Sequence, residues 1–519
     1  MSRFAWSVAI GLATTLIALA LFTAHSAPAG FLWLGDGMHN PSDVAVYLSY
    51  LQQGADGHIF LRDLFAVEPH RLRFDPIWSG LGLVARTGID PIVIHEAGRA
   101  FFSILLVVAL WFAAKSVTKS ERDANLALLL SIFGIATGWI YSIWLGSQGL
   151  WTPTTYAAPD IVTEFAVGPI LFGGAHVILS LALLVTAIRW LWNGIQTNNL
   201  RLSIRGALVG AVLLAFHPYF AALLAIIGLL AWVTSTKRRD AFRSLVVSGL
   251  ILVPPVAYYV WLLLDPVFGD HHLTANLLPL APLPVWLITL APFIVALGWM
   301  WHKKLLPKRL DWTSAWILST ILLLIILPVP WKRKLTEGLA VPLVFLTLPA
   351  WLAVRDWVSK QQPKWMSRLL ATLLILAAGF GPLHLVISHA SWIYRTDQRG
   401  YFYQPSGLFE AASFLKRETD TEAVLLSDDR WINVWLPALT GRRVWIGHDH
   451  ETPDFERKRE LYHELLATTD PARLRALLDE MRTTHIVITT DAGQNLEALL
   501  DSTWTKVFSS GTVRVWKIQ

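Results

Sequence analysis

Cysteine is absent from this sequence. Its absence excludes disulfide bonds, metal sites with thiolate ligands and a cysteine nucleophile. Charged residues are also scarce, at 15% of the chain, whereas a soluble protein carries roughly 25%. The formal net charge is +6, but the basic residues lie mostly between apolar segments. They therefore indicate membrane topology, and nucleic acid is not expected as a partner.

Apolar residues make up 54% of the chain and are gathered in long segments. A helix of about twenty such residues crosses ~30 Å of hydrocarbon. Many of the 26 tryptophans lie at segment ends, where amphipathic rings prefer the membrane interface. The pattern predicts an α-helical polytopic membrane protein with about eleven transmembrane helices. The predicted spans are 4–24, 97–114, 124–145, 168–188, 206–217, 219–235, 244–264, 284–301, 312–328, 338–354 and 369–389.

Two of these spans allow alternative interpretations. The segment 4–24 resembles a signal peptide, but it is long for one and Ala27-Pro28-Ala29 is a poor cleavage site, so we expect a retained helix. His217-Pro218-Tyr219 separates 206–217 from 219–235, and the proline is compatible with a tight turn or with a kink.

Basic residues alternate from one connection to the next. The short connections 146–167 and 265–283 contain no Lys or Arg. The positive-inside rule then places the N-terminus in the cytoplasm and the C-terminal residues outside the cell membrane. The cytoplasmic connections contain Lys115, Lys119 and Arg122; Arg189, Arg201 and Arg205; Lys237, Arg238, Arg239 and Arg243; Lys303, Lys304, Lys308 and Arg309; and Arg355, Lys360, Lys364 and Arg368.

Two regions lie outside the predicted spans. Residues 25–96 form a first outer loop, which we expect to contain short helices on the membrane surface. Residues 400–519 alternate strands with helices, which predicts a small α/β sheet. The predicted division is therefore a transmembrane domain at 1–395, which includes this loop, and an extracytoplasmic α/β domain at 396–519. The elements expected in the second domain are helices 409–417, 454–467 and 471–482, strands 423–427, 443–447 and 485–489, and a strand pair near 504–518.

One short outer connection breaks the charge rule, because it contains Lys332, Arg333 and Lys334 in succession. Lipid head-group contact or a local ion pair with Glu337 would account for them. The functional alternative is an anion site that faces a cavity.

Ionisable residues near the bilayer often mark functional sites. Asp43 follows the first span closely, although Pro41-Ser42-Asp43 is also a good helix start, so capping and catalysis both remain open. Asp160 and Glu164 are four residues apart and would share one face of a helix. The other candidates near outer ends of the spans are Asp36, Glu68 and His217.

Several short segments resemble the GT-C superfamily of polytopic glycosyltransferases, and together they extend over nearly the whole chain. Many relatives have two adjacent acidic residues where this chain has Asp43, which leaves open which carboxylate is the base. The segments are Asp43-Val-Ala-Val-Tyr47-Leu48, Gln52-Gln53-Gly54, Phe65-Ala-Val-Glu68, Pro159-Asp160-Ile-Val-Thr-Glu164-Phe165, His217-Pro218-Tyr219, Lys332-Arg333-Lys334-Leu-Thr-Glu337-Gly338-Leu-Ala-Val-Pro342-Leu343, Thr440-Gly441-Arg442-Arg443-Val-Trp-Ile-Gly447-His448 and Glu451-Thr452.

The resemblance implies transfer of a hexose or pentose from a polyprenyl-phosphate-linked donor. The acceptor is a hydroxyl of a glycan, lipid or protein at the outer membrane face. Asp43 is the implied general base, and Arg333 with Lys332 or Lys334 is implied to stabilise the departing phosphate. Direct displacement inverts the sugar and needs no covalent intermediate. The other residues implied in substrate or donor binding are Asp36, Glu68, Asp160, Glu164, His217 and His448.

No cofactor is certain. Asp36, Asp43 and Glu164 offer oxygen ligands that a divalent metal ion accepts. The alternative is that Lys332, Arg333 and Lys334 neutralise the phosphate without a metal ion.

Three other classes of protein compete with the transferase. A transporter or flippase should show internal repeats, which are absent here. A polysaccharide polymerase or ligase of unrelated fold has its large outer loop late in the chain. A non-catalytic membrane scaffold has no need of outer cations.

Overall fold

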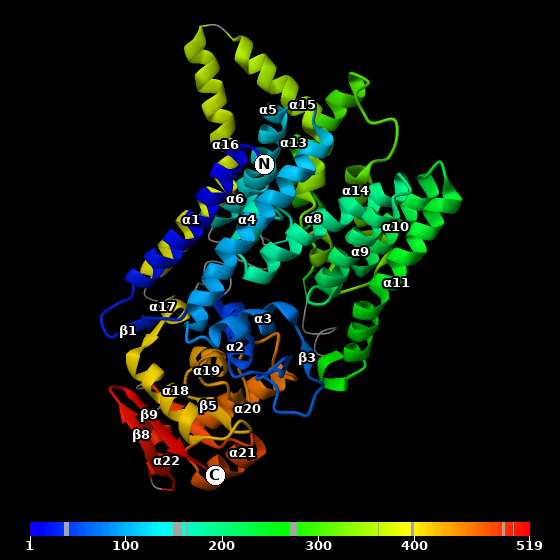
Figure 1. Ribbon diagram of the computed structural model, residues 1–519. Coiled ribbons are helices and arrows are strands. Elements are labelled where there is room, and N and C mark those ends of the chain that lie inside the picture. Colours follow the sequence, from blue (N-terminus) through cyan, green and yellow to red (C-terminus); the bar gives the residue numbers. More distant parts are fainter. Residues whose placement is uncertain are drawn as a thin grey trace. The chain divides into compact units, whose positions relative to one another are not determined.

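The structure is a computed structural model of the chain (Figure 1). It describes all residues except 36–40, 149–157, 162–163, 270–277, 362, 396–398, 490–493, 502 and 519. Its internal contacts divide the chain into two compact units, which are described separately. Unit 1 comprises Met1–Thr15, Arg99–Tyr259 and Leu277–Ala390, and unit 2 comprises Leu16–Gly98, Val260–Asn276 and Ser391–Gln519.

Long apolar helices dominate the part of the chain assigned to unit 1, and the chain is an integral membrane protein. Among the described residues, six segments are long and apolar enough to cross a membrane: α1 (Arg3–His25), α4 (Pro91–Val117), α8 (Ala175–Gln196), α11 (Arg238–Leu263), α13 (Leu283–His302) and Lys332–Lys360. The last contains the 3-10 helix η2 (Lys332–Thr336) and α15 (Ala340–Lys360). The predicted count of eleven spans stays a prediction.

The remaining helices of this part are shorter, apart from α16. They are α5 (Glu121–Phe133), α6 (Trp139–Ser147), α7 (Val167–Leu171), α9 (Leu200–Leu214), the 3-10 helix η1 (Pro218–Phe220), α10 (Ala221–Thr234), α14 (Trp312–Ile326) and α16 (Lys364–Tyr394).

Two predicted spans are wrong as single helices, and glycines explain both. The segment 124–145 is divided into α5 and α6, because Gly134 has a φ of 77° and ends α5, a backbone conformation that glycine adopts readily. The segment 168–188 is divided into α7 and α8, with Gly173 and Gly174 between them. Of the two interpretations of Pro218, the structure has the turn, because α9 ends at Leu214 and α10 begins after η1.

Unit 2 contains the predicted small sheet. Its five strands have the order β6-β5-β7-β9-β8. Strand β5 pairs in parallel with β6 and β7, and β9 pairs antiparallel with β7 and β8. The strands are β5 (Val424–Ser427), β6 (Arg443–Val444), β7 (His485–Ile488), β8 (Thr505–Ser510) and β9 (Val513–Lys517).

Helices pack around this sheet. The predicted helices are present as α18 (Ser406–Glu418), α20 (Phe455–Ala467) and α21 (Pro471–Glu480). The prediction omitted α19 (Arg430–Thr440) and α22 (Gln494–Asp501). Pro437 lies inside α19, and a proline in a helix interior argues against a helix from sequence alone.

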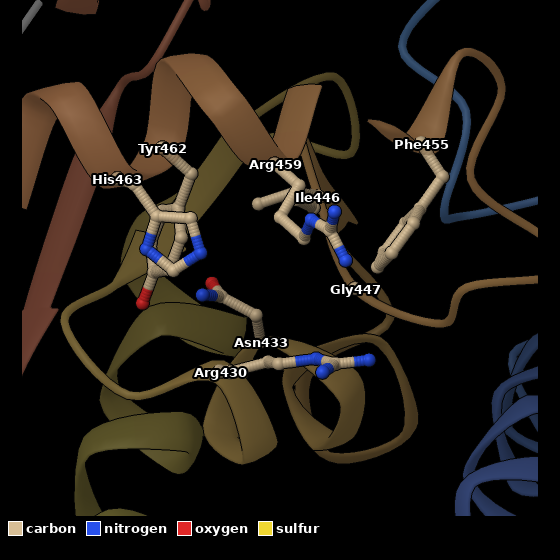
Figure 2. Close-up of a pocket in the computed structure, with 8 residues that line it drawn as sticks. All are labelled: Arg430, Asn433, Ile446, Gly447, Phe455, Arg459, Tyr462 and His463. Carbon is tan, nitrogen blue, oxygen red and sulfur yellow. The ribbon is translucent and has the colours of Figure 1, made fainter. Parts of the chain in front are cut away.

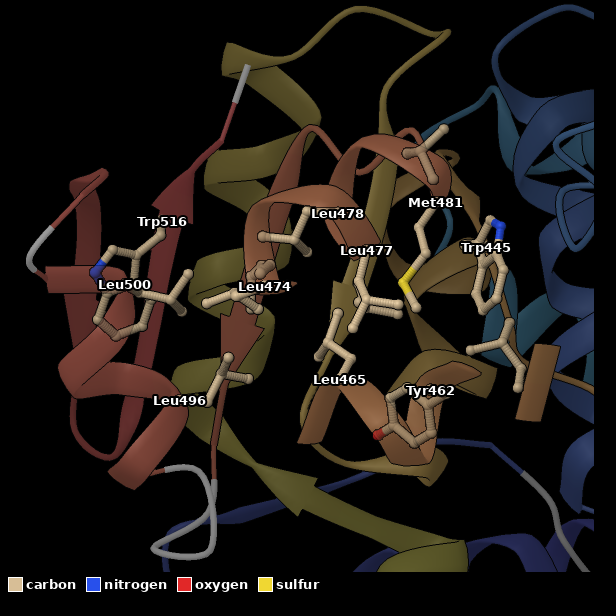
Figure 3. Close-up of a cluster of buried hydrophobic side chains, with 14 of the residues drawn as sticks. Trp445, Tyr462, Leu465, Leu474, Leu477, Leu478, Met481, Leu496, Leu500 and Trp516 are labelled. Atoms are coloured by element: carbon tan, nitrogen blue, oxygen red, sulfur yellow. The ribbon is translucent and has the colours of Figure 1, made fainter. Parts of the chain in front are cut away.

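The core of the sheet region is formed by Leu, Ile, Val and Trp side chains together with Tyr462 and Met481 (Figure 3). Leu474, Leu477 and Leu478 of α21 are fully buried in this cluster, beside Leu465 of α20 and Trp516 of β9. All four residues of β5 and of β7 are buried, as expected for strands covered on both faces.

The predicted first outer loop belongs to the same unit as the C-terminal residues. It contains α2 (Pro41–Ala55) and α3 (Pro76–Ala85), with the short antiparallel pair β2 (Phe60–Leu61) and β3 (Arg73–Phe74). Strand β1 (Phe31–Trp33) pairs antiparallel with β4 (Tyr403–Pro405), which follows the short helix α17 (Arg399–Phe402).

Helix α2 is held from two sides. Val44 and Leu48 pack against Trp435 of α19 in one buried cluster. At the crossing with α3, a Cβ atom on Gly82 would lie 2.5 Å from the Cα atom of Gly54. Only glycine permits this close approach, so these contacts fix the position of α2 within the unit.

Candidate functional site

The first candidate site lies in unit 2, where Asp43 and His448 meet. Asp43 is in the first turn of α2. Its Oδ1 atom lies 3.0 Å from Nε2 of His448. The His448 side chain is 2% exposed, whereas that of Asp43 is 38% exposed. Asp43 is therefore the member of the pair that a ligand can reach, and His448 supports it from the interior.

Local structure fixes the position of His448 after strand β6. Gly447 precedes it, and a Cβ atom at Gly447 would lie 2.7 Å from the ring of Phe65. That ring packs edge-on against His448, with 6.1 Å between centroids. The backbone N–H of Thr452 donates to the His448 carbonyl at 2.9 Å. Gly447 and Thr452, which belong to the segments that resemble the GT-C superfamily, therefore have a structural role: they hold His448 in place.

Another part of these segments is structural as well. Gly441 ends α19 in the left-handed conformation, with a φ of 67°. The buried guanidinium of Arg442 donates to the carbonyl oxygens of Lys416 and Thr419, at 2.7 and 2.9 Å. Arg442 thus ties the end of α18 to the segment that precedes β6.

The surroundings of His448 determine its protonation. The backbone N–H of His450 donates to Nδ1 of the neutral ring at 3.1 Å, so the proton of that form lies on Nε2 and points at Asp43. Burial lowers the pKa of His448, but the hydrogen bond and charge of Asp43, with the charges of Glu451 and Asp449, outweigh burial and raise the pKa. The Asp43 carboxylate therefore favours the imidazolium form.

Two further carboxylic acids lie in this region. Burial raises the pKa of Asp63, although the Phe65 backbone N–H and the charge of Arg73 oppose the shift. Burial, followed by the charge of Asp63, raises the pKa of Glu451. Sequence reasoning did not select these residues as site candidates. The signals available for Glu451 were its place in the family-like pair Glu451-Thr452 and its spacing, three residues after His448.

The raised pKa of His448 predicts a pH-dependent stability. A histidine whose pKa is higher in the folded than in the unfolded protein contributes stability below its unfolded pKa of about 6.5, and the contribution is lost as pH rises through the folded value. Replacing Asp43 with asparagine should therefore lower the melting temperature more at pH 5.5 than at pH 9. Thermal unfolding of the full chain measures this difference. Asp56→Asn is the control, because Asp56 pairs with a lysine, Lys416, and not with a histidine. A difference that grows toward pH 9 would contradict the assignment.

The second candidate site lies in unit 1 around Glu164. The carboxylate of Glu164 is 2% exposed, and its Oε2 atom lies 3.1 Å from Nε of Arg333. Lys334 approaches the other oxygen at 3.5 Å. The Arg333 and Lys334 side chains are 16% and 20% exposed. Two partly accessible cations therefore share one buried carboxylate.

The backbone holds this cluster in place. The N–H of Gly338, whose φ is 70°, donates to the Glu164 carbonyl at 2.7 Å. The backbone N–H of Arg333 donates to the Leu278 carbonyl at 3.1 Å. An ion pair with Glu337 was one of the alternatives considered for the cations, beside lipid head-group contact and an anion site. The Glu337 carboxylate accepts from Ser180 at 2.6 Å and pairs with Nε2 of His217 at 3.0 Å.

Lys332 does not share the arrangement of its two neighbours. Its Nζ atom donates to the Leu324 carbonyl at 3.0 Å. Leu324 lies in the last turn of α14, where carbonyl groups lack intrahelical partners. Lys332 is therefore a helix-capping residue, and only Arg333 and Lys334 of the three cations lie on Glu164.

The other predicted residues are dispersed. Glu68 pairs with Lys458 of α20 at 2.7 Å. Asp160 accepts a hydrogen bond from the backbone N–H of Trp139 at 3.2 Å, and burial raises its pKa to about 7. Asp160 and Glu164 lie in turns on either side of 162–163, so the helical face predicted for them is wrong. Asp36 lies outside the described residues.

The predicted metal ligands are Asp36, Asp43 and Glu164. Among the described residues, no group of three or more His, Asp or Glu side chains is arranged to hold a metal ion. Asp43 and Glu164 belong to different units. The metal site stays a prediction.

Comparison with known proteins shows similarity in fold but not in sequence. No protein-family model and no curated protein sequence matches the chain. The arabinofuranosyltransferase AftD from Mycobacteria, solved as a variant, is similar with a TM-score of 0.53 at 13% identity, over 98% of this chain and 41% of AftD. This chain therefore spans about two fifths of AftD.

Two further solved structures give TM-scores of 0.48. ArnT from Cupriavidus metallidurans in the apo state is 12% identical, over 99% of this chain and 98% of ArnT. The archaeal oligosaccharyltransferase AglB from Archaeoglobus fulgidus, in complex with an inhibitory peptide and a dolichol-phosphate, is 11% identical, over 94% of this chain and 70% of AglB. The likeness to AftD carries the conclusion on architecture: this chain shares its fold with the matched part of that protein.

Proposed function

We propose that this protein is a glycosyltransferase. It moves a sugar from a polyprenyl-phosphate-linked donor to a hydroxyl of a glycan, lipid or protein acceptor. The reaction takes place at the outer face of the cell membrane, with the N-terminus in the cytoplasm and residues 396–519 as the extracytoplasmic domain. The charge alternation of the connections supports this orientation.

The observation that carries the proposal is the pair of Asp43 and His448. A general base must be accessible to the proton that it removes and held in a fixed orientation. Asp43 is accessible, and the buried imidazole of His448 contacts it at 3.0 Å. The Asp43 carboxylate accepts the proton of the acceptor hydroxyl, and the oxygen attacks the anomeric carbon of the donor sugar.

The bond from the anomeric carbon to the phosphate oxygen breaks in the same step, and polyprenyl phosphate leaves with the electron pair. Arg333 and Lys334 stabilise the charge that develops on this phosphate, because cations in a poorly hydrated site act strongly on developing charge. Their partial exposure beside the buried Glu164 supports this role. A single displacement inverts the anomeric configuration, and no glycosyl-enzyme intermediate forms.

A direct assay tests the proposal. The purified protein in proteoliposomes is supplied with polyprenyl phosphates that carry labelled glucose, mannose or arabinose, together with a glycan, lipid or peptide acceptor. We expect one donor to give free polyprenyl phosphate and labelled acceptor in equal amounts, with inverted anomeric configuration. Movement of intact donor across the bilayer without cleavage would instead identify a flippase, and retention of configuration would contradict direct displacement.

A further inference from the structure

A pocket in unit 2 is separate from the residues assigned to the reaction. It lies between α19 and α20, beside the chain segment that follows β6, and it has a volume of about 380 Å³ including its open mouth. Figure 2 shows Arg430 of α19 and Arg459 of α20 on different sides of this space, with the ring of Phe455 nearby. The space is small and open to solvent, so a ligand would occupy it only in part.

The polar groups at the base of the pocket are satisfied by the protein. The side chain of Asn433 accepts from the Ser427 backbone N–H at 2.7 Å and donates to the Ser427 carbonyl at 3.0 Å. The hydroxyl of Tyr462 donates to the same carbonyl at 3.0 Å. These groups shape the base, and the polar contacts of a ligand must come from the walls.

The walls are mostly apolar, and two arginine side chains are among the residues that line them. None of the described residues that line the pocket is acidic. Within the described part of the chain, the Arg430 guanidinium makes no hydrogen bond or ion pair, and its contacts are the rings of Trp431 and Phe455, at 5.7 and 5.5 Å. Arg459 pairs with Glu456, but both side chains are exposed, at 45% and 70%. Exposed pairs of this kind are weak, so Arg459 is available to an anion.

An aromatic ring accompanies the two cations. Phe455 is partly buried and lines the pocket, and Figure 2 shows its ring beside the chain at Gly447. Planar aromatic rings present an apolar face, and a sugar ring offers C–H groups that pack on such a face. Cations with donors in a planar fork match carboxylate and phosphate oxygens. An anionic sugar combines both of these chemical features.

We propose that this pocket binds an anionic sugar, one that carries a phosphate or carboxylate group, with its charge between Arg430 and Arg459 and its ring against Phe455. Gly447, which lines the pocket, directly precedes His448, the partner of Asp43. The pocket therefore holds the anionic part of the acceptor. This last assignment rests on the proposed function, whereas binding itself does not.

Saturation-transfer difference NMR on the full chain in nanodiscs tests the pocket without donor. The probes are glucose 6-phosphate, glucuronate and uncharged glucose, with inorganic phosphate as a competitor. We expect the first two to bind and glucose to bind at least tenfold more weakly. Replacing both Arg430 and Arg459 with glutamine should weaken binding of glucose 6-phosphate by about tenfold or more, because hydrogen bonds to charged groups are among the stronger ones.

Arg457→Gln is the matched control. Arg457 lies on the same helix, is 72% exposed and pairs with Glu480 outside the pocket, so its loss should leave binding unchanged. Asp43→Asn should also retain binding while it loses transfer, which separates failure of the pocket from failure of the proposed chemistry. Equal binding by the double glutamine variant, or equal affinity for glucose, would overturn the pocket. Equal affinity for inorganic phosphate would overturn the assignment to a sugar.

Discussion

Turnover by the Asp43→Asn variant is expected to fall by about 10²-fold or more, which is the range for loss of a general base. Asparagine keeps the shape of the side chain and accepts the hydrogen bond from His448, but it does not accept a proton from a hydroxyl at neutral pH. Donor binding should be unchanged, because Asp43 acts on the acceptor. The measurements are the initial rate at saturating donor and the dissociation constant of the donor.

Asp56→Asn is the matched control for this variant. Asp56 directly follows α2, has an exposed fraction of 37% like that of Asp43, and forms an ion pair with Lys416. Its loss should leave turnover unchanged. Near-normal turnover of Asp43→Asn would reject Asp43 as the base and would direct attention to Asp36 or Glu164.

The second large effect is expected at Arg333. Replacing it with lysine keeps the charge but removes the planar fork, and transfer should fall by about 10²-fold, as for loss of one donor to a developing oxyanion. A loss of transfer could have two causes. Arg333 could contact the donor phosphate directly, or it could act only by neutralising Glu164, with which it forms an ion pair. The double variant Arg333→Lys/Glu164→Gln separates them. If Arg333 contacts the donor phosphate, the double variant stays about 10²-fold slower than Glu164→Gln alone.

Lys332 is the control that tests whether positive charge in this loop is sufficient, whatever the position of the side chain. It contributes the same charge to the same loop but donates to the Leu324 carbonyl. Lys332→Gln should therefore leave the KM for donor unchanged, while Lys334→Gln should raise it. If all three cations contribute equally, and Arg333→Lys is fully active, head-group anchoring is the better explanation and the phosphate role is wrong.

The sequence predicts best what depends on local composition. Apolar length located the long helices, and alternation of strands with helices predicted the C-terminal sheet. Errors arose where one residue overrides a continuous apolar pattern, as Gly134 does between α5 and α6. The omission of α19 was avoidable in part, because Asp429 caps its N-terminus and Gly441 ends it, and both are helix signals.

The sequence indicated which individual residues are candidates for the sites, but it did not indicate which of them contact one another. Asp43 and His448 are 405 residues apart in sequence, and Glu164 and Arg333 are 169 apart. Periodicity and spacing carry no information over such separations. For the same reason the Lys458 partner of Glu68 and the His217 partner of Glu337 were not foreseen. Charge counting singled out the three consecutive cations 332–334, but it did not distinguish the capping role of Lys332 from the roles of its neighbours.

The pairing of β1 with β4 has a consequence for how the protein is made. Residues 31–33 are hydrogen-bonded to residues 403–405, so the first strand leaves the ribosome several hundred residues before its partner. At roughly 5–20 residues per second, the delay is on the order of half a minute. During this time α2 lacks α19, and Asp43 lacks His448. The apolar face of α2 therefore lacks its cover until α19 has been made. A chain interrupted before residue 448 contains the proposed base without its support.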